Sequence, residues 1–88
     1  MADLDEFTQK NIEQIAQRIR ALRKERGYSN QEKFAYEIDI ARAQYGRYER
    51  GIDLKISSLS KILFAHGITL QDFFAEGFGD VEEKKSLE

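Results

Sequence analysis

Three side chains with strong, directional hydrogen-bonding groups lie within six residues of each other. They are Arg42, Gln44 and Arg47, and the small residue Ala43 separates the first two. Arginine is the usual bidentate partner of guanine, glutamine can pair with adenine, and alanine can touch a thymine methyl group. These residue types could read the bases of a nucleic acid if one helix presented them together.

The chain lacks the residues that most enzymes and metal sites need. It has no cysteine and a single histidine, His66, so the sequence offers neither a thiol nucleophile nor a cluster of cysteine or histidine ligands. Capping, surface and ion-pair roles explain the acidic residues in the middle of the chain better than a catalytic carboxylate pair does. We therefore expect no enzymatic activity, no metal and no cofactor.

Apolar residues at helical spacing predict an all-α fold. Ile12, Ile15, Ile19 and Leu22 form one stripe along a first helix at about 9–26. Because the chain has no proline, glycines and capping residues must mark the other boundaries. Four further helices are expected: 31–38, 42–50, one that ends before Gly67 and a short one through Phe73, Phe74 and Ala75.

Residues with short polar side chains predict where these helices begin, since they can accept hydrogen bonds from free backbone N–H groups. The expected caps are Thr8 for the first helix, Ser29 (in a capping box with Glu32) or Asn30 for the second, Ser57 or Ser58 for the fourth and Thr69 (with Asp72) for the fifth.

Five short helices in 88 residues predict a compact five-helix bundle that forms one domain. We place this domain at 8–76, between acidic segments at 1–7 and 77–88 that we expect to be frayed. The N-terminus has no signal peptide, and no apolar run is long enough to span a bilayer, so a cytoplasmic protein is expected.

The helices expected at 31–38 and 42–50 are joined by a turn of about three residues that contains Asp39. Two short helices with this connection form a helix-turn-helix unit, whose second helix enters the major groove of DNA. Its N-terminal side chains and those one turn on would then reach the base edges. The expected base contacts are Arg42, Ala43, Gln44 and Arg47.

The charge distribution also favours a polyanionic partner. Residues 8–66 contain twelve lysines and arginines against seven acidic residues, whereas the two ends are acidic and the whole chain has a net charge of -2. A solvated charged surface without any partner is the simpler alternative.

Three segments together resemble the Cro/repressor-type helix-turn-helix, or Xre, family. They are Gly27–Ala35, Tyr45–Gly51, which contains Glu-Arg-Gly at its end, and Ala65–Leu70. The resemblance runs from about Ile12 to Phe74 and implies a lambda-repressor-like DNA-binding domain. It places the four base-contacting residues at the same positions as the helix-turn-helix geometry does.

The resemblance also implies roles for residues outside the base-reading face. Gln31, Arg50 and Lys55 match phosphate-contacting positions, and Arg23 and Glu49 match an ion pair that joins the first helix to the end of the third. Since such proteins commonly bind near-palindromes, a homodimer is expected, with the Phe74–Phe78 region or the connector near it at the contact. Phe73 is expected in the core, and Phe74 and Phe78 either pack there too or line that contact.

Several positions depart from the family pattern. Asp39 replaces a turn glycine, Ala41 replaces a capping Ser or Thr, and Tyr45 and Tyr48 replace aliphatic core residues, so their hydroxyls must find partners or reach the surface. His66 replaces leucine, and as a cation it would interact favourably with the end of its helix. Gly46 is unfavourable inside an exposed helix, which is either a neutral accident or a sign of close approach to a nucleic acid.

The sequence thus predicts a sequence-specific regulator that binds double-stranded DNA. A phage or mobile-element repressor, an antitoxin and a restriction-modification controller are all compatible with its size. The alternative is a helical protein-interaction module that has lost DNA binding. A basic exposed face on the helix at 42–50 is the feature that favours the regulator.

Overall fold

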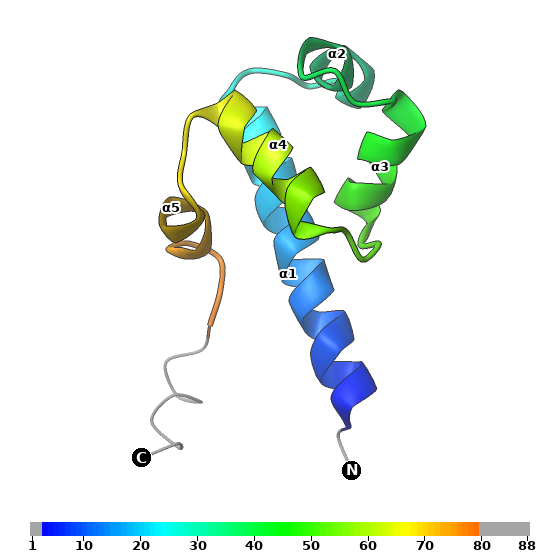
Figure 1. Ribbon diagram of the computed structural model, residues 1–88, viewed down its shortest axis with the longest axis vertical. Helices are drawn as coiled ribbons and strands as arrows, with labels where there is room; N and C mark the ends of the chain where they lie inside the picture. Colours follow the sequence, from blue (N-terminus) through cyan, green and yellow to red (C-terminus); the bar gives the residue numbers. More distant parts are fainter. Residues whose placement is uncertain (1–2, 80–88) are drawn as a thin grey trace.

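The computed structural model describes residues 3–79, and these form an all-α fold without a strand. Its helices are α1 (Leu4–Glu25), α2 (Gln31–Glu37), α3 (Arg42–Arg50), α4 (Ile56–His66) and α5 (Leu70–Phe74). Figure 1 shows α1 as the longest element, with α2 and α3 near its C-terminal half and α5 on the other side. The predicted five-helix architecture is confirmed.

The first helix begins earlier than predicted. Asp3 is its N-cap and accepts a hydrogen bond from the Glu6 N–H at 3.0 Å, so the expected cap at Thr8 is wrong. Residues 4–7, expected to be frayed, form the first turns of α1, because the acidic side chains there interact favourably with a helix N-terminus. At the other end of the chain, residues 80–88 of the predicted frayed segment lie outside the described residues.

The start of α2 and the turn that follows this helix both form at residues that the sequence suggests. At the start, Asn30, rather than Ser29, caps α2 and accepts hydrogen bonds from the Glu32 and Lys33 N–H groups. Asp39 adopts the left-handed conformation, with φ of 61°, which reverses the chain without the usual glycine. The N-cap of α3, Ala41, has no side-chain hydrogen bond.

The last two helices differ in how they begin. Lys55 caps α4 without a side-chain hydrogen bond, so the prediction of Ser57 or Ser58 as the cap is wrong; both serines lie within the helix. The capping box of Thr69 and Asp72 at the start of α5 is confirmed, since each side chain accepts from the other's backbone N–H.

One core joins all five helices. Its largest fully buried apolar and aromatic side chains are Tyr45, Phe34, Phe73, Ile19 and Ile62. The rings of Phe34 and Tyr45 meet edge to face with their centroids 5.4 Å apart, which fixes α2 against the inward face of α3. The Tyr45 hydroxyl neither reaches the surface nor makes a hydrogen bond in the described part of the chain, contrary to expectation. Burial, followed by the nearby Glu49 carboxylate, raises the pKa of Tyr45.

Candidate nucleic-acid interface

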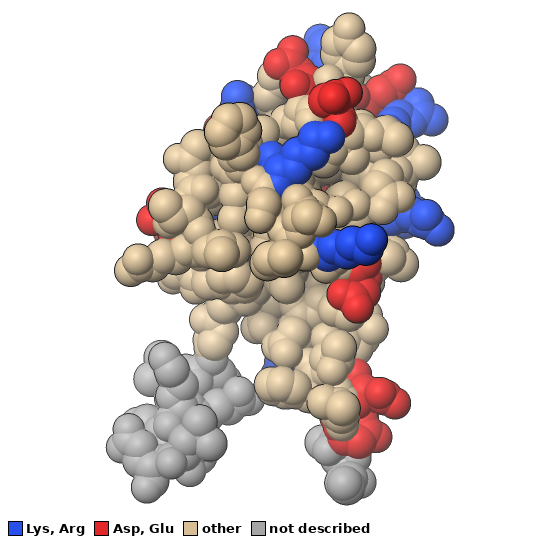
Figure 2. All heavy atoms as spheres, viewed as in Figure 1, with Lys and Arg blue, Asp and Glu red and all other residues tan. Residues whose placement is uncertain are grey.

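The outward face of α3 carries the residues expected to read bases. The side chains of Tyr45 and Tyr48 point into the core, which leaves the opposite side of the helix to solvent. All four candidate base-contacting residues are exposed on this helix: Arg42, Ala43, Gln44 and Arg47. In Figure 2, lysine and arginine side chains lie over α2, α3 and α4 with acidic side chains among them, and further acidic side chains lie at the N-terminal end of α1.

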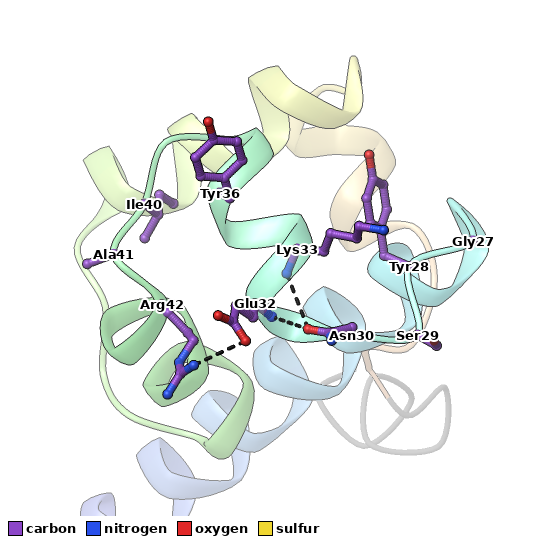
Figure 3. A pocket seen from close by; sticks show the side chains of 10 residues that line it. All are labelled: Gly27, Tyr28, Ser29, Asn30, Glu32, Lys33, Tyr36, Ile40, Ala41 and Arg42. Carbon is purple, nitrogen blue, oxygen red and sulfur yellow. Dashed lines mark hydrogen bonds and ion pairs between the residues drawn. The ribbon is translucent and has the colours of Figure 1, made fainter.

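Arg42 forms an ion pair across the turn in the free protein. Its Nη1 lies 3.1 Å from Oε1 of Glu32 on α2, and the two side chains are 66% and 63% exposed. Figure 3 shows this pair beside a hollow that is lined by α2 and the turn before α3. Because water screens such an exposed pair, Arg42 can exchange this carboxylate for another acceptor at small free-energy cost.

Gln44 is also hydrogen-bonded within the protein. Its Nε2 donates to the Tyr48 hydroxyl at 2.9 Å, and this hydroxyl donates to Oγ of Ser58 at 3.1 Å. Sequence reasoning identified Gln44 but missed this chain of hydrogen bonds. The only signal was that Tyr48, in an aliphatic core position, needed a partner for its hydroxyl.

A polar groove separates the start of α2 from the outer face of α3, and two expected phosphate-contacting residues line it. These are Gln31 and Arg50. A methyl group added at Gly46 would lie 3.3 Å from both Arg50 Nη1 and Gln31 Oε1. Gly46 is therefore buried beneath these side chains, and the assumption that it is exposed is wrong; the missing side chain leaves room for its neighbours.

The third expected phosphate contact is separate from this groove. Lys55 is exposed at the N-cap of α4, after the extended connector that follows α3. The structure therefore brings Gln31 and Arg50 together and places Lys55 on another element.

A buried carboxylate joins the helix-turn-helix to α1. Arg23 donates from Nε to Oε2 of Glu49 at 2.7 Å and from Nη2 to Oε1 at 3.1 Å, which is a bidentate ion pair. The Nε2 of Gln31 donates to the same Oε1 at 2.8 Å. Glu49 is 1% exposed and Arg23 is 4% exposed, so both partners of the pair are buried.

The electrostatics of this pair favour its charged form. Burial alone would raise the pKa of Glu49, but the hydrogen bonds and positive charge of Arg23, together with the nearby Tyr45 hydroxyl and the Gln31 amide, lower it below its ordinary value. The hydrogen bonds to Glu49 raise the pKa of Arg23. The Glu49 carboxylate therefore links α1, α2 and α3, through its ion pair with Arg23 and its hydrogen bond from Gln31.

His66 does not act as the expected helix-capping cation. Its ring stacks on Phe34 at a centroid distance of 5.1 Å, and its buried Nε2 has no hydrogen-bond partner among the described residues. Burial, followed by the charges of Arg26 and Arg18, lowers the pKa of His66 to about 4. The imidazole is thus neutral near pH 7 and substitutes for an apolar residue.

The aromatic cluster at α5 has one buried and one exposed side. Phe73 is fully buried, as expected, whereas Phe74 is 42% exposed. Phe78 packs against both rings and is half-buried. Phe74 and Phe78 line a groove with Phe7 and other residues of the first turns of α1.

Comparison with known proteins agrees with the class that this geometry defines. Residues 19–73 match the helix-turn-helix family. A Mycoplasma protein named control protein C.MunI is 37% identical over 60 residues, which cover 67% of this chain and 81% of that protein. No solved structure matches the chain with significance. No helix in the described residues has the length and apolar character needed to cross a membrane.

The fold and its exposed basic helix thus define a helix-turn-helix protein. More specifically, the chain belongs to the Xre-type helix-turn-helix family of DNA-binding transcriptional regulators.

Proposed function

We propose that the protein is a sequence-specific regulator that binds double-stranded DNA with α3 in the major groove. The observation that carries this proposal is the shared exposure of Arg42, Ala43, Gln44 and Arg47 on one helix that the core holds by its opposite side. The major groove admits one α-helix, and these residue types match the hydrogen-bonding groups and methyl groups of its bases.

The neighbouring polar groups would position this helix on the phosphates. Arg50 in the groove and Lys55 at the start of α4 are exposed cations that can approach the backbone of the duplex. Gln31 already donates one amide N–H to Glu49, so a phosphate contact from its side chain would use the second N–H.

The protein acts as a homodimer on a near-palindromic operator in this proposal. Half-sites about 34 Å apart require two copies related by a two-fold axis. Phe74, whose ring is partly exposed beside Phe78, supplies an apolar contact for the second copy. Among the regulators compatible with this size, the name of the related control protein favours a controller over a repressor or an antitoxin.

Selection of bound sequences from a random duplex library tests the proposal. We expect a near-palindromic consensus, and binding to it should weaken steeply with salt, by a slope of about -0.9 per neutralised phosphate. No enriched sequence at low salt, or a flat salt titration, would reject DNA reading and favour the helical protein-interaction module instead.

A further inference from the structure

The hydrogen bonds that begin at Gln44 connect the base-reading surface to the core. Gln44 is exposed on the first turns of α3, whereas Tyr48, one turn further on, is 6% exposed. Ser58 lies half-buried in α4 and accepts from the Tyr48 hydroxyl. This contact is the one side-chain hydrogen bond that joins α3 to α4 within residues 3–79.

These hydrogen bonds orient the Gln44 amide. The Tyr48 hydroxyl donates its one hydrogen to Ser58 and accepts from Nε2 of Gln44. In this arrangement Nε2 faces Tyr48, which leaves the second N–H and the carbonyl oxygen of Gln44 for a ligand. An amide held in this way presents one donor and one acceptor side by side.

A donor beside an acceptor is what adenine requires in the major groove. Its N7 accepts a hydrogen bond, and its N6 amino group donates one. Guanine presents two acceptors at the same place, so it cannot satisfy an amide that is fixed in this orientation. We infer that Tyr48 and Ser58 are positioning residues that orient the Gln44 amide and thereby set a preference for adenine at one operator position.

This inference rests on the proposed function, and it adds the two residues that orient Gln44 toward that base. Without the tyrosine hydroxyl, the glutamine side chain would rotate freely and could offer two donors as well as a donor and an acceptor. Ordering the side chain before binding also reduces the entropy that is lost on contact with the base.

The test compares Tyr48→Phe and Ser58→Ala with the wild-type protein on its selected operator. Tyr48→Phe keeps the buried ring, so the domain is expected to fold, and Tyr36→Phe removes an exposed hydroxyl on α2 as a matched control. We expect the wild-type preference for adenine to fall about fivefold in Tyr48→Phe, as for one lost hydrogen bond, with little change on operators that lack this adenine. Ser58→Thr keeps a hydroxyl acceptor and should restore the preference that Ser58→Ala loses.

Two further measurements separate positioning from a purely structural role. In the free protein, NMR relaxation of the Gln44 side-chain amide should show order in the wild type and fast motion in Tyr48→Phe and Ser58→Ala. Replacing the operator adenine with 7-deazaadenine, which lacks the N7 acceptor, should weaken the wild type more than Tyr48→Phe.

The outcomes distinguish this inference from the proposed function. If no duplex sequence is enriched by the wild type, both fail. If a consensus is found but it holds guanine at the position sensitive to Gln44→Ala, or if no position is sensitive to it, only the inference is overturned. The same conclusion follows if Tyr48→Phe keeps the wild-type adenine preference and an ordered Gln44 amide.

Discussion

Arg20 on α1 donates from Nη1 to the backbone carbonyl oxygen of Glu49 at 2.6 Å, while Arg23, one turn further along α1, binds the carboxylate of the same residue. Glu49 is therefore held through its backbone and its side chain by a single helix. Since Glu49 is the second-last residue of α3, these contacts fix the C-terminal end of the recognition helix against α1.

Replacing Glu49 with alanine should lower the melting temperature sharply. The substitution leaves the Arg23 guanidinium buried without its partner, and breaking a buried ion pair destabilises a protein by about 3–5 kcal/mol. DNA affinity should fall as well, because the recognition helix loses its anchor. Thermal unfolding followed by circular dichroism measures the effect. As a control, Glu32→Ala breaks the exposed pair with Arg42 and should change stability by less than about 1 kcal/mol. Equal melting temperatures for the wild type and Glu49→Ala would contradict the prediction.

His66 should make the protein less stable as the pH falls from neutral. The unfolded chain protonates this histidine near its ordinary pKa of 6.5, whereas the folded protein does so only near 4. Between these values the unfolded state binds the extra proton, so the free energy of unfolding decreases as the pH falls through this window and levels off below it. Burial of the neutral ring is the main cause.

Urea unfolding of His66→Leu tests this prediction. The variant should lose the decrease in stability between about pH 7 and about pH 5, because leucine binds no proton. Glu49 does not contribute to the change in this pH range. Its pKa is lowered in the folded protein, so its protonation reduces stability only as the pH falls below 4.5, the ordinary pKa of a glutamate. An unchanged pH dependence in His66→Leu would show that the histidine is solvated in the folded protein.

Substitutions on the proposed DNA surface should separate into two groups. Lys55→Ala should weaken binding to all duplexes about equally and reduce the salt slope by about 1, since a lysine that contacts a phosphate carries no sequence information. Arg42→Ala should reduce affinity for the best operator by about 1–3 kcal/mol and relax its preference at one position. Titrations of selected and scrambled duplexes at several salt concentrations distinguish the two; a uniform loss in both variants would reject base contact by Arg42.

Phe74→Ser should disrupt cooperative binding to a two-half-site operator while binding to an isolated half-site persists. The partly exposed ring lies beside Phe78, where we propose the second copy to contact. Phe64→Ser is a suitable control, because Phe64 on α4 is 86% exposed and lies outside this cluster. The stoichiometry and the Hill coefficient measure the effect. If Phe64→Ser abolishes cooperativity and Phe74→Ser does not, the dimer forms through α4.

The sequence predicts the helices well where local interactions decide their boundaries. Gly51 ends α3 in the left-handed conformation, and Thr69 and Asp72 form their capping box, because each depends on residues a few positions apart. The start of α4 was missed because serines are good caps in general, while here the connector reaches helical geometry at Ile56. The start of α1 was missed because Thr8 is also a residue type that caps helices, while here Asp3 caps the helix earlier and the exposed residues 4–7 continue it.

The candidate site is predictable in its residue types but not in its internal contacts. Which helix presents Arg42 and Gln44 follows from periodicity and from the resemblance to a known family. The hydrogen bond between Tyr48 and Ser58 does not, since it depends on how α3 and α4 pack. The neutral state of His66 was likewise hidden, because it depends on burial against Phe34, which no local pattern reveals.

The cap of α3 gives the recognition helix two unequal ends. Ala41 supplies no side-chain acceptor at the start of the helix, whereas the end is clamped through Glu49. The C-terminal end of α3 is thus fixed to α1, whereas its N-terminal end, which carries Arg42 and Ala43, has no side-chain cap. The backbone amides of α3 should exchange with solvent slowly near Tyr48 and quickly near Arg42. The turn of the helix that we propose to meet the bases is thus the one that the scaffold leaves able to adjust to the groove.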